Sequence, residues 1–313
     1  MNRVLITGAS GFIGRALVTA FAEHGLAVRA TVRRPPEPSF SAGVEVMQHP
    51  NLTQPVNWRP LLKGVVDVVH LAGIAHSSRR TPPELYDRVN TVATKRLAIA
   101  AAKAGIRRFV FVSSIRAQSG SAADHALTES DPAAPVDVYG RSKLAAEEAV
   151  RAAGVPFTIL RPVVLYGPEA KGNVALLARA AASRLPLPVK DFSNRRSFLG
   201  IDNFISALAF VLSTPVTTGE TYVVADPGIP PSISGAIAAL RQAANRRPFI
   251  FSIPTRYVEV PLRIARLSDM WDRIGGNLRV DAGKLMAAGW QPLHDTRTGL
   301  VAMAQAARRN ASA

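Results

Sequence analysis

Two side chains that could move a proton, Tyr139 and Lys143, are four residues apart in the segment Tyr139-Gly140-Arg141-Ser142-Lys143. In a helix this spacing places both side chains on one face. A free phenol has a pKa of about 10, and a nearby ammonium group favours the phenolate and lowers that pKa. The phenol could then donate a proton to a carbonyl oxygen, or accept one from an alcohol, while a hydride moves to or from nicotinamide.

The position of Tyr139 and Lys143 supports this chemistry, because a serine follows the strand that precedes their helix. Residues 108–113 are typical of a buried strand and residues 138–153 of a helix. Ligands of parallel sheets bind beyond the carboxyl ends of the strands, where Ser114 would lie. We therefore expect Ser114 to hydrogen-bond the oxygen that Tyr139 protonates. The alternatives are a plain strand-end turn for the serine and an ordinary amphipathic-helix position for the tyrosine.

A glycine-rich segment near the N-terminus indicates a site for a dinucleotide. Gly8, Gly11 and Gly14 follow an expected strand and open an expected helix, with two residues between each pair. Such glycines let the backbone approach a pyrophosphate, and the first amides of the helix face its negative charge. We expect Phe12 and Ile13, at the start of the helix, to contact the cofactor as well. The alternative is a tight turn that only allows close packing.

The end of the second expected strand favours NADP(H) over NAD. An acidic residue at this place would bind the ribose hydroxyls of NAD, but Ala30-Thr31-Val32 is followed by Arg33 and Arg34. Guanidinium groups suit a 2′-phosphate. Two solvated arginines in an arginine-rich chain are the alternative, so NAD stays open.

The elements that must position these residues alternate between strand and helix. Such alternation is typical of a parallel sheet and predicts an α/β chain. We expect a nucleotide-binding domain at residues 1–165 and a mainly substrate-binding lobe at residues 166–313. Some segments of the lobe are expected to return to the first domain. Strands are expected at residues 3–6, 27–33, 44–48, 65–71, 108–113 and 157–161, and helices at residues 12–24, 84–104, 138–153, 175–183, 203–212 and 234–244. The segments expected to return to the first domain are residues 201–212 and 221–224.

Composition narrows the function classes. The chain has no cysteine, which excludes disulfides, thiolate catalysis and thiolate-bound metal, and its six histidines lack the spacing of a zinc site, so we expect no metal. The formal charge of +16 is dispersed and accompanies no nucleic-acid-binding motif, so we expect no nucleic acid partner. No apolar run reaches about 18 residues, so we expect no membrane insertion and a cytoplasmic location.

These motifs resemble the extended short-chain dehydrogenase/reductases over about residues 4–290. Within that family the chain looks most like the nucleotide-sugar branch, the NAD-dependent epimerases and dehydratases, which includes UDP-glucose 4-epimerases and UDP-4-keto-sugar reductases of the N-acetylquinovosamine type. The resemblance implies a Rossmann doubly wound parallel sheet and, in many relatives, a homodimer formed through the helices at residues 84–104 and 138–153. The segments that carry it are Thr7–Gly14, residues 70–73, Val89-Asn90, residues 111–116, Tyr139–Lys143, residues 161–168 and residues 194–203.

The resemblance also implies a role for each matching residue. Ser114 and Tyr139 would be catalytic, with Lys143 binding the nicotinamide ribose. Asn173 would contact the nucleotide sugar and Arg196 its diphosphate, although each could instead be an ordinary loop or surface residue; His76 could reach the substrate or lie in solvent. The other residues implied to line the cofactor are Leu52, Leu71, Ala72, Gly73, Asn90 and Pro162.

The chain departs from the family pattern at three places. Asn51 stands where an acidic residue is common near the adenine, Ser119 stands where a glycine is common, and Met286-Ala287-Ala288 lacks a frequent arginine. The first and third departures put those contacts in doubt. The implied activity is hydride chemistry at C4 of a UDP-linked sugar, with a 4-keto reductase favoured over a 4-epimerase that retains NAD. A reductase of a non-sugar ketone and a non-catalytic NADP-binding protein are the alternatives.

Overall fold

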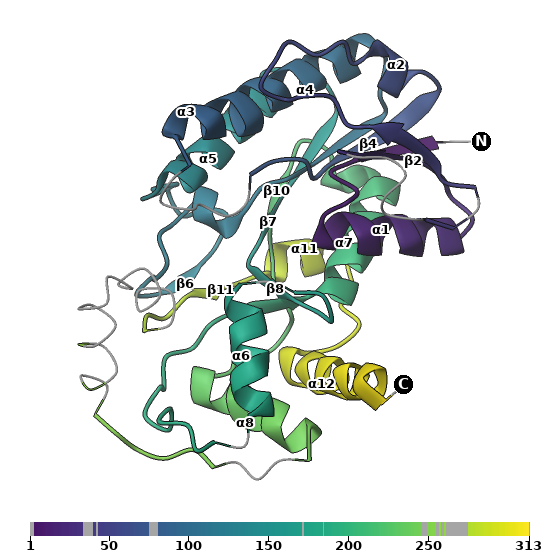
Figure 1. Cartoon of the computed structure of the whole chain (residues 1–313). Helices are drawn as coiled ribbons and strands as arrows, with labels where there is room; N and C mark the ends of the chain where they lie inside the picture. The colour runs from purple at the N-terminus through teal and green to yellow at the C-terminus, as the bar shows by residue number, and fades with distance from the viewer. Residues whose placement is uncertain are drawn as a thin grey trace.

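The main sheet of the computed structural model consists of seven parallel strands in the order β10-β7-β5-β4-β1-β2-β3 (Figure 1). The model describes residues 3–33, 40–41, 43–74, 81–170, 172–183, 185–245, 249–254, 257, 260 and 275–312. The strand order reverses direction between β1 and β4, which is where doubly wound sheets bind ligands. The strands are β1 (Arg3–Thr7), β2 (Ala27–Val32), β3 (Glu45–Gln48), β4 (Val65–His70), β5 (Arg108–Val112), β7 (Phe157–Pro162) and β10 (Thr221–Val224).

Helices cover both faces of this sheet. On one face α4 (Ala93–Lys103) packs against α5 (Val138–Arg151), and on the other α1 (Phe12–Glu23) packs against α7 (Ile201–Ser213) (Figure 1). Residues of β1 alternate between the two layers: Val4 and Ile6 belong to the core on the α1 side, and Leu5 belongs to the core on the α4 side. A strand buried on both faces is apolar at successive positions, as a parallel sheet requires.

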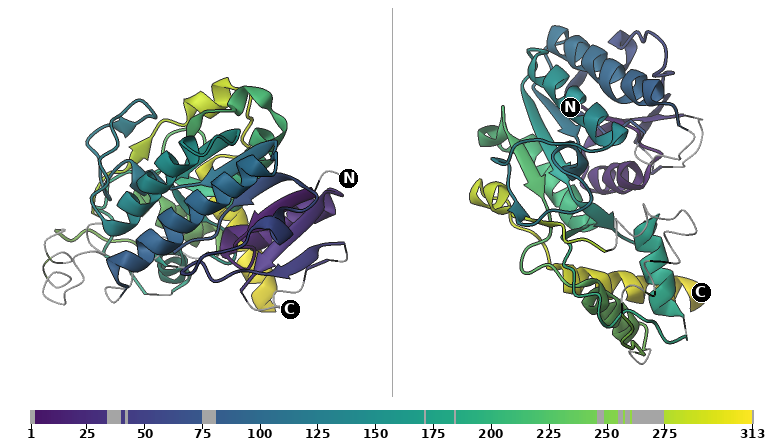
Figure 2. Two further views of the ribbon diagram at one scale, coloured as in Figure 1. Left: turned by 90° about the horizontal axis from the view of Figure 1, so that it is seen from above. Right: turned by 90° about the vertical axis from the view of Figure 1, so that its left-hand side faces the viewer.

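A smaller lobe lies beyond the carboxyl ends of the strands (Figure 2). The chain leaves β7 and enters the lobe directly at β8 (Val164–Tyr166), which pairs in parallel with β9 (Phe198–Gly200). The lobe has a core of its own, built around residues such as Tyr166, Phe198 and Leu240. Its helices are α6 (Asn173–Ala182), α8 (Ile233–Ala243) and α12 (Thr296–Ser312).

Short elements join these two parts. A two-stranded sheet pairs β6 (Ala126–Leu127) with β11 (Arg279–Val280), so the loop after β5 touches the C-terminal part of the chain. The remaining elements are α2 (Arg59–Leu62), α3 (Pro83–Tyr86), α11 (Gly283–Ala287) and the turns η1 (Asp87–Val92), η2 (Ile115–Ala117) and η3 (Pro215–Thr217).

The single helix expected at residues 84–104 is divided in the structure. It consists of α3, the π-helical turn η1 and α4. A π turn widens a helix locally and is frequent at functional sites. Here it carries Asn90, whose side chain is 1% exposed and bonds a neighbouring loop. The contacts of Asn90 therefore account for an interruption that helix propensity does not predict.

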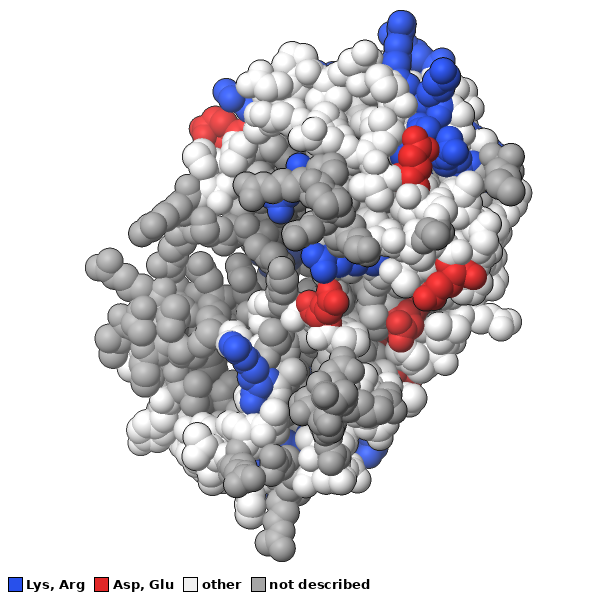
Figure 3. Space-filling model, turned by 45° about the vertical axis from the view of Figure 1, so that its right-hand side comes forward, with Lys and Arg blue, Asp and Glu red and all other residues white. Residues whose placement is uncertain are grey.

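Charged side chains on the face drawn in Figure 3 stand in separate groups, with acidic residues between the basic ones. On this face the described Lys and Arg residues form no continuous stripe of the kind that tracks a nucleic acid backbone. Within the described residues, no helix combines the length and the apolar character needed to cross a bilayer.

Candidate active site

The turn between β1 and α1 forms a cradle of backbone groups. Gly8 has a φ of 73°, and an added Cβ there would lie 2.8 Å from the backbone nitrogen of Ala72. An added Cβ at Gly14 would overlap the carbonyl oxygen of Gly8. Only glycine permits these approaches. The N-cap of α1 is Gly11, which offers no side-chain hydrogen bond, and the first turn of α1 holds no acidic residue. The first amides of α1, including those of Phe12 and Ile13, are thus available to a pyrophosphate.

The end of β4 lies against this cradle. The backbone nitrogen of Leu71 donates to the carbonyl oxygen of Thr7 at 3.2 Å, and that of Ala72 donates to the Thr7 hydroxyl at 3.3 Å. The structure therefore brings Leu71, Ala72 and Gly73 beside the glycine turn, at the point where the strand order reverses. Their backbone can line a dinucleotide bound there.

The end of β2 is basic. Arg33 is exposed directly after the strand. Burial lowers the pKa of His49 against the opposing hydrogen bond with the Pro50 carbonyl, and the charge of Arg33 lowers it further. Leu52 is buried in the core on the α4 side. Asn51 uses its side-chain oxygen to accept from the backbone of Thr53 at 3.1 Å, which closes a local turn. Arg34 and His76 lie outside the described residues.

Ser114 and Tyr139 meet at the end of β5. Ser114 caps the η2 turn by accepting from the backbone nitrogen of Arg116 at 3.2 Å, and its side chain shares a hydrogen bond with the phenol of Tyr139. Tyr139 lies in the first turn of α5, whose N-cap Asp137 accepts from the backbone nitrogen of Gly140 at 2.6 Å. A capped helix and a capped turn thus hold both hydroxyls at one place.

The environment of Tyr139 favours its protonated form. Burial raises the pKa of Tyr139 to about 12, against the opposing effect of the hydrogen bond with Ser114. The expectation that Lys143 lowers this pKa is wrong for this structure, since burial dominates and Lys143 is not among the charges that act on the phenol. The side chain is therefore an acid that can give a proton to a keto oxygen.

Lys143 is 7% exposed and points toward β5. Its Nζ donates to the carbonyl oxygen of Val112 at 2.7 Å and lies 4.2 Å from the ring centroid of Phe111. Burial lowers the pKa of Lys143 to about 7, while the carboxylate of Glu147 raises it. The ammonium is thereby placed between the last residue of β5 and the helix that carries Tyr139.

Asn90 joins the loop after β4 to helix α5. Its Oδ1 accepts from the backbone nitrogen of Ile74 at 2.8 Å, and its Nδ2 donates to the Ile74 carbonyl at 3.1 Å and to the Ser142 hydroxyl at 3.0 Å. These bonds use both donors and the acceptor of the amide. In this structure Asn90 fixes the loop that would line the cofactor, next to Gly73.

The remaining predicted site residues lie in the second lobe and at the end of β7. Arg196 is 9% exposed, and its Nη1 donates to the carbonyl oxygens of Ser121 and Gly276, each at 3.0 Å. Burial lowers the pKa of Arg196 to about 10, and the charge of Arg116 adds to that shift. Pro162 is buried at the carboxyl end of β7. Asn173 begins α6, and its side chain lies outside what the structure describes.

A buried polar cluster behind the site was missed by sequence reasoning. The carboxylate of Glu147 pairs with Arg161 in a bidentate manner, at 2.9 and 2.7 Å, and accepts from the Ser113 hydroxyl at 2.5 Å. Arg161 also donates to Gln118 at 3.0 Å. The only signal in the sequence was a carboxylate one turn after Lys143, which is common on solvated helix faces.

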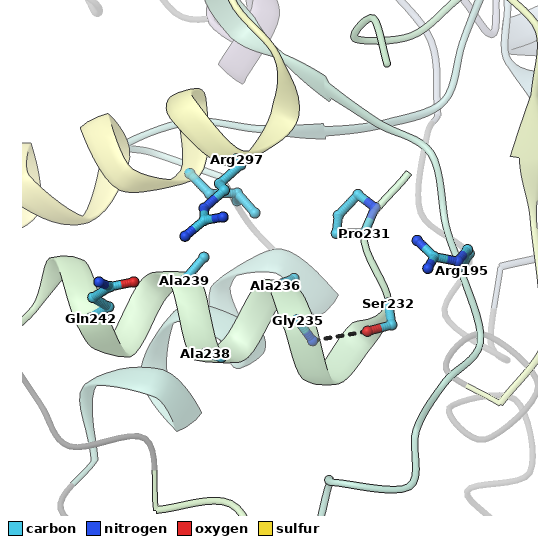
Figure 4. A pocket seen from close by; sticks show the side chains of 10 residues that line it. Arg195, Pro231, Ser232, Gly235, Ala236, Ala238, Ala239, Gln242 and Arg297 are labelled. Carbon is cyan, nitrogen blue, oxygen red and sulfur yellow. Dashed lines mark hydrogen bonds between the residues drawn. The ribbon is translucent and has the colours of Figure 1, made fainter. Parts of the chain in front are cut away.

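A surface pocket of about 380 Å³ lies on the second lobe, above the small residues of α8 (Figure 4). Arg195 and Arg297 stand on either side of it, and Arg195 donates to the Pro230 carbonyl at 2.7 Å. None of the predicted cofactor-binding or substrate-binding residues lines this pocket. The pocket is therefore separate from the candidate active site.

Comparison with curated proteins identifies relatives of more than one activity. A UDP-glucose 4-epimerase of Vibrio cholerae is 29% identical over 314 residues, which cover 97% of this chain and 94% of that protein. A ceramide reductase of Caulobacter vibrioides is 36% identical over 214 residues, which cover 68% of this chain and 62% of that protein. The first relative matches over both the sheet domain and the second lobe.

A solved structure and a family model also match this chain. The structure of MoeE5 in complex with UDP-glucose and NAD superimposes with a TM-score of 0.77 at 26% identity, over 99% of this chain and 100% of that one. The sequence model of the family described as NAD dependent epimerase/dehydratase matches residues 4–225, which include the glycine turn, Ser114, Tyr139 and Lys143. This confirms the resemblance and the doubly wound fold that the sequence predicted. The chain belongs to the NAD dependent epimerase/dehydratase family.

Proposed function

We propose that this protein catalyses NAD(P)-dependent hydride transfer at C4 of a UDP-linked sugar. The observation that carries the proposal is the hydrogen-bonded pair of Ser114 and Tyr139 at the carboxyl end of β5, the same end of the parallel sheet that carries the glycine cradle after β1. In the proposed complex the cradle holds the pyrophosphate of the cofactor and the second lobe holds the sugar nucleotide. The similarity to a UDP-glucose 4-epimerase over nearly the full length supports this substrate class.

The residues of this chain would handle the proton rather than the hydride. A bound nicotinamide supplies or accepts the hydride. Tyr139 would donate its proton to the oxygen on C4, and Ser114 would orient that oxygen by a second hydrogen bond. Arg196 would hold the diphosphate through its guanidinium group. Lys143 would bind the nicotinamide ribose.

Two observations favour a 4-keto reductase that uses NADPH. Tyr139 is held as the acid, which is the form that a keto oxygen requires. Arg33 stands directly after β2, where an acidic residue would bind the ribose hydroxyls of NAD. A guanidinium group at this place suits a 2′-phosphate. A reductase would consume one equivalent of reduced cofactor in each turnover.

A 4-epimerase that retains NAD is the second candidate. Its support is the Vibrio cholerae relative and the likeness to MoeE5, whose structure contains UDP-glucose and NAD. Such an enzyme would oxidise C4, let the keto sugar turn and return the hydride to the other face. It would need no added cofactor.

The nucleotide that co-purifies with the protein separates these versions. Mass spectrometry of the denatured protein would identify it, and absorbance would follow the consumption of added NADPH with a UDP-4-keto-hexose. NADPH oxidation supports the reductase. Tightly retained NAD, with interconversion of UDP-glucose and UDP-galactose and no consumption of NADPH, would overturn it in favour of the epimerase.

The ceramide reductase relative favours a third candidate, the reduction of a non-sugar ketone. That reaction would not need Arg196 to contact a diphosphate. Isothermal titration of the purified protein with UDP, and of an Arg196→Met variant, tests this point. Binding of UDP that is weakened in the variant supports the sugar nucleotide, whereas no binding of UDP to either protein would favour a non-sugar ketone.

A further inference from the structure

We propose that the ion pair between Arg116 and Asp137 is the positioning device of the catalytic pair, holding Ser114 and Tyr139 in register and balancing the charge around the phenol. This inference rests on the proposed function of Tyr139 as the proton donor.

Arg116 contacts both sides of the site. Its backbone nitrogen donates to the Ser114 hydroxyl at 3.2 Å. Its carbonyl oxygen lies so close to Gly140 that an added Cβ at that glycine would overlap it. Its Nη2 donates to Oδ2 of Asp137 at 2.5 Å. One residue thus holds the serine through its backbone and the start of α5 through its side chain.

The two carboxylate oxygens of Asp137 bond one element each, η2 and α5. Oδ2 accepts from Arg116, while Oδ1 accepts from the backbone nitrogen of Gly140 at 2.6 Å and caps α5. Tyr139 lies two residues after Asp137 in the first turn of that helix. A shift of α5 along its axis would carry Asp137 with the helix and would therefore have to break the ion pair with Arg116.

The charges that face the phenol come from several elements. Asp137 at the start of α5 raises the pKa of Tyr139, and Arg116 from η2 lowers it. Tyr86 from α3 adds a small upward effect. Lys143, one turn along α5, directs its Nζ to the Val112 carbonyl, and Arg196 from the second lobe is close enough for Arg116 to lower its pKa.

The opposite signs of these two charges supply a sharp test. Arg116→Met removes a cation whose charge lowers the pKa of Tyr139, so that pKa should rise. Asp137→Asn keeps a residue that can cap α5 and removes an anion, so the same pKa should fall. We expect each shift to be about half a pH unit or more, and the double variant should lie close to the wild type.

The measurement is an alkaline titration of the whole protein, in which phenolate formation is followed by ultraviolet absorbance. Subtracting the curve of the matching Tyr139→Phe protein isolates Tyr139 from the other four tyrosines. Arg141→Met is the matched control, because Arg141 is an exposed arginine on the same helix that bonds the Val136 carbonyl. Shifts of opposite sign support the proposal; no shift, or shifts of the same sign, would overturn it.

Turnover of whichever test substrate of the proposed function the wild-type protein converts is the second readout. Arg116→Met should lower kcat by about 10²-fold through misplacement of Ser114 and Tyr139. Arg116→Lys, which keeps the charge but loses the guanidinium fork, should restore the titration curve and only part of kcat. If Tyr139→Phe keeps full turnover, the proposed function fails whatever the titration shows. If Tyr139→Phe abolishes turnover but Arg116→Met leaves kcat and titration unchanged, only the ion-pair proposal fails.

Discussion

The reaction proposed for this protein depends on one phenol, that of Tyr139, as its proton donor. Its burial keeps it protonated, with a pKa of about 12, and Ser114 provides the hydroxyl that shares the reacting oxygen. General acids positioned in this way contribute about 10²–10⁴-fold to a rate. The direction of reaction that uses the acid form first is reduction of a keto group.

Tyr139→Phe should abolish most of the turnover, by about 10³-fold, and leave the affinity for the nicotinamide cofactor nearly unchanged. The ring keeps its packing and only the proton donor is removed. Steady-state kinetics and fluorescence titration with NADPH or NAD measure the two quantities. Tyr222→Phe, on the edge strand β10 beside Lys284, is the control. Equal turnover in the wild type and in Tyr139→Phe would contradict the mechanism.

Lys143→Met should reduce the dependence of stability on pH. Burial lowers the pKa of Lys143 from 10.5 to about 7, so between these values the unfolded chain binds a proton that the folded chain does not hold. The unfolding free energy of the wild type therefore rises with pH, by roughly 3 kcal/mol between pH 6 and pH 9 from this group. Below pH 7 the folded wild type carries a buried charge. In that range Lys143→Met should have its largest gain in unfolding free energy relative to the wild type.

Urea titrations followed by circular dichroism measure this effect. The free energy of unfolding of Lys143→Met minus that of the wild type should decrease from pH 6 to pH 9. Lys103→Met, an exposed lysine at the end of α4, should give a difference that does not vary with pH. A constant difference for Lys143→Met as well would show that its ammonium is not desolvated.

At the scale of elements, the buried pair of Glu147 and Arg161 ties helix α5 to strand β7. Ser113 at the end of β5 and Gln118 after η2 join the same cluster. Four elements around the active site thus share one polar network. Breaking a buried ion pair by removing one partner costs about 3–5 kcal/mol, because the other charge stays behind.

Glu147→Gln should therefore lower the free energy of unfolding by about 3 kcal/mol, and kcat should fall with it because α5 loosens. Chemical denaturation and steady-state kinetics are the measurements. Glu148→Gln is the matched control, since Glu148 is the next residue and is exposed; its effect should stay within about 0.5 kcal/mol. Similar losses in both variants would contradict a special role for the buried cluster.

The sequence predicted those parts of the site that lie within one strand–turn–helix unit. The turn from Gly8 to Gly14 and the succession of Ser114 and Tyr139 follow from local spacing and from the rule for strand ends. The ion pair of Arg116 and Asp137 joins residues 21 positions apart, and no periodic pattern in the sequence predicts it. The π turn at Asn90 was missed for the same reason, because it depends on a bond to Ile74.

At the scale of the whole molecule, one buried carboxylate links the two parts of the chain. Asp226, the second residue after β10, accepts from the hydroxyls of Tyr166 and Thr296 at 2.8 and 3.0 Å. It also accepts from the backbone nitrogen of Gly200 and the side-chain amide of Asn203 at 2.8 and 2.7 Å. These donors come from β8, α12, β9 and α7.

Asp226→Ala should lower the free energy of unfolding by about 3 kcal/mol, because it leaves several buried donors without an acceptor. Thermal and urea denaturation measure the loss. Asp202→Ala is the control, since Asp202 lies on α7 with its carboxylate 70% exposed, and its effect should be within about 0.5 kcal/mol. A loss as small as that of the control would show that the linkage carries little of the stability.

The path of the chain after β7 has a consequence for recombination between relatives. The backbone enters the second lobe at β8, returns to the sheet for α7 and β10, and leaves again for α8. A chimera with a single crossover near residue 165 would pair the edge strand of one parent with the central strands of the other. Exchange of sugar specificity by grafting would instead need several junctions, placed so that α7, β10 and Asp226 stay with the sheet they were selected to fit.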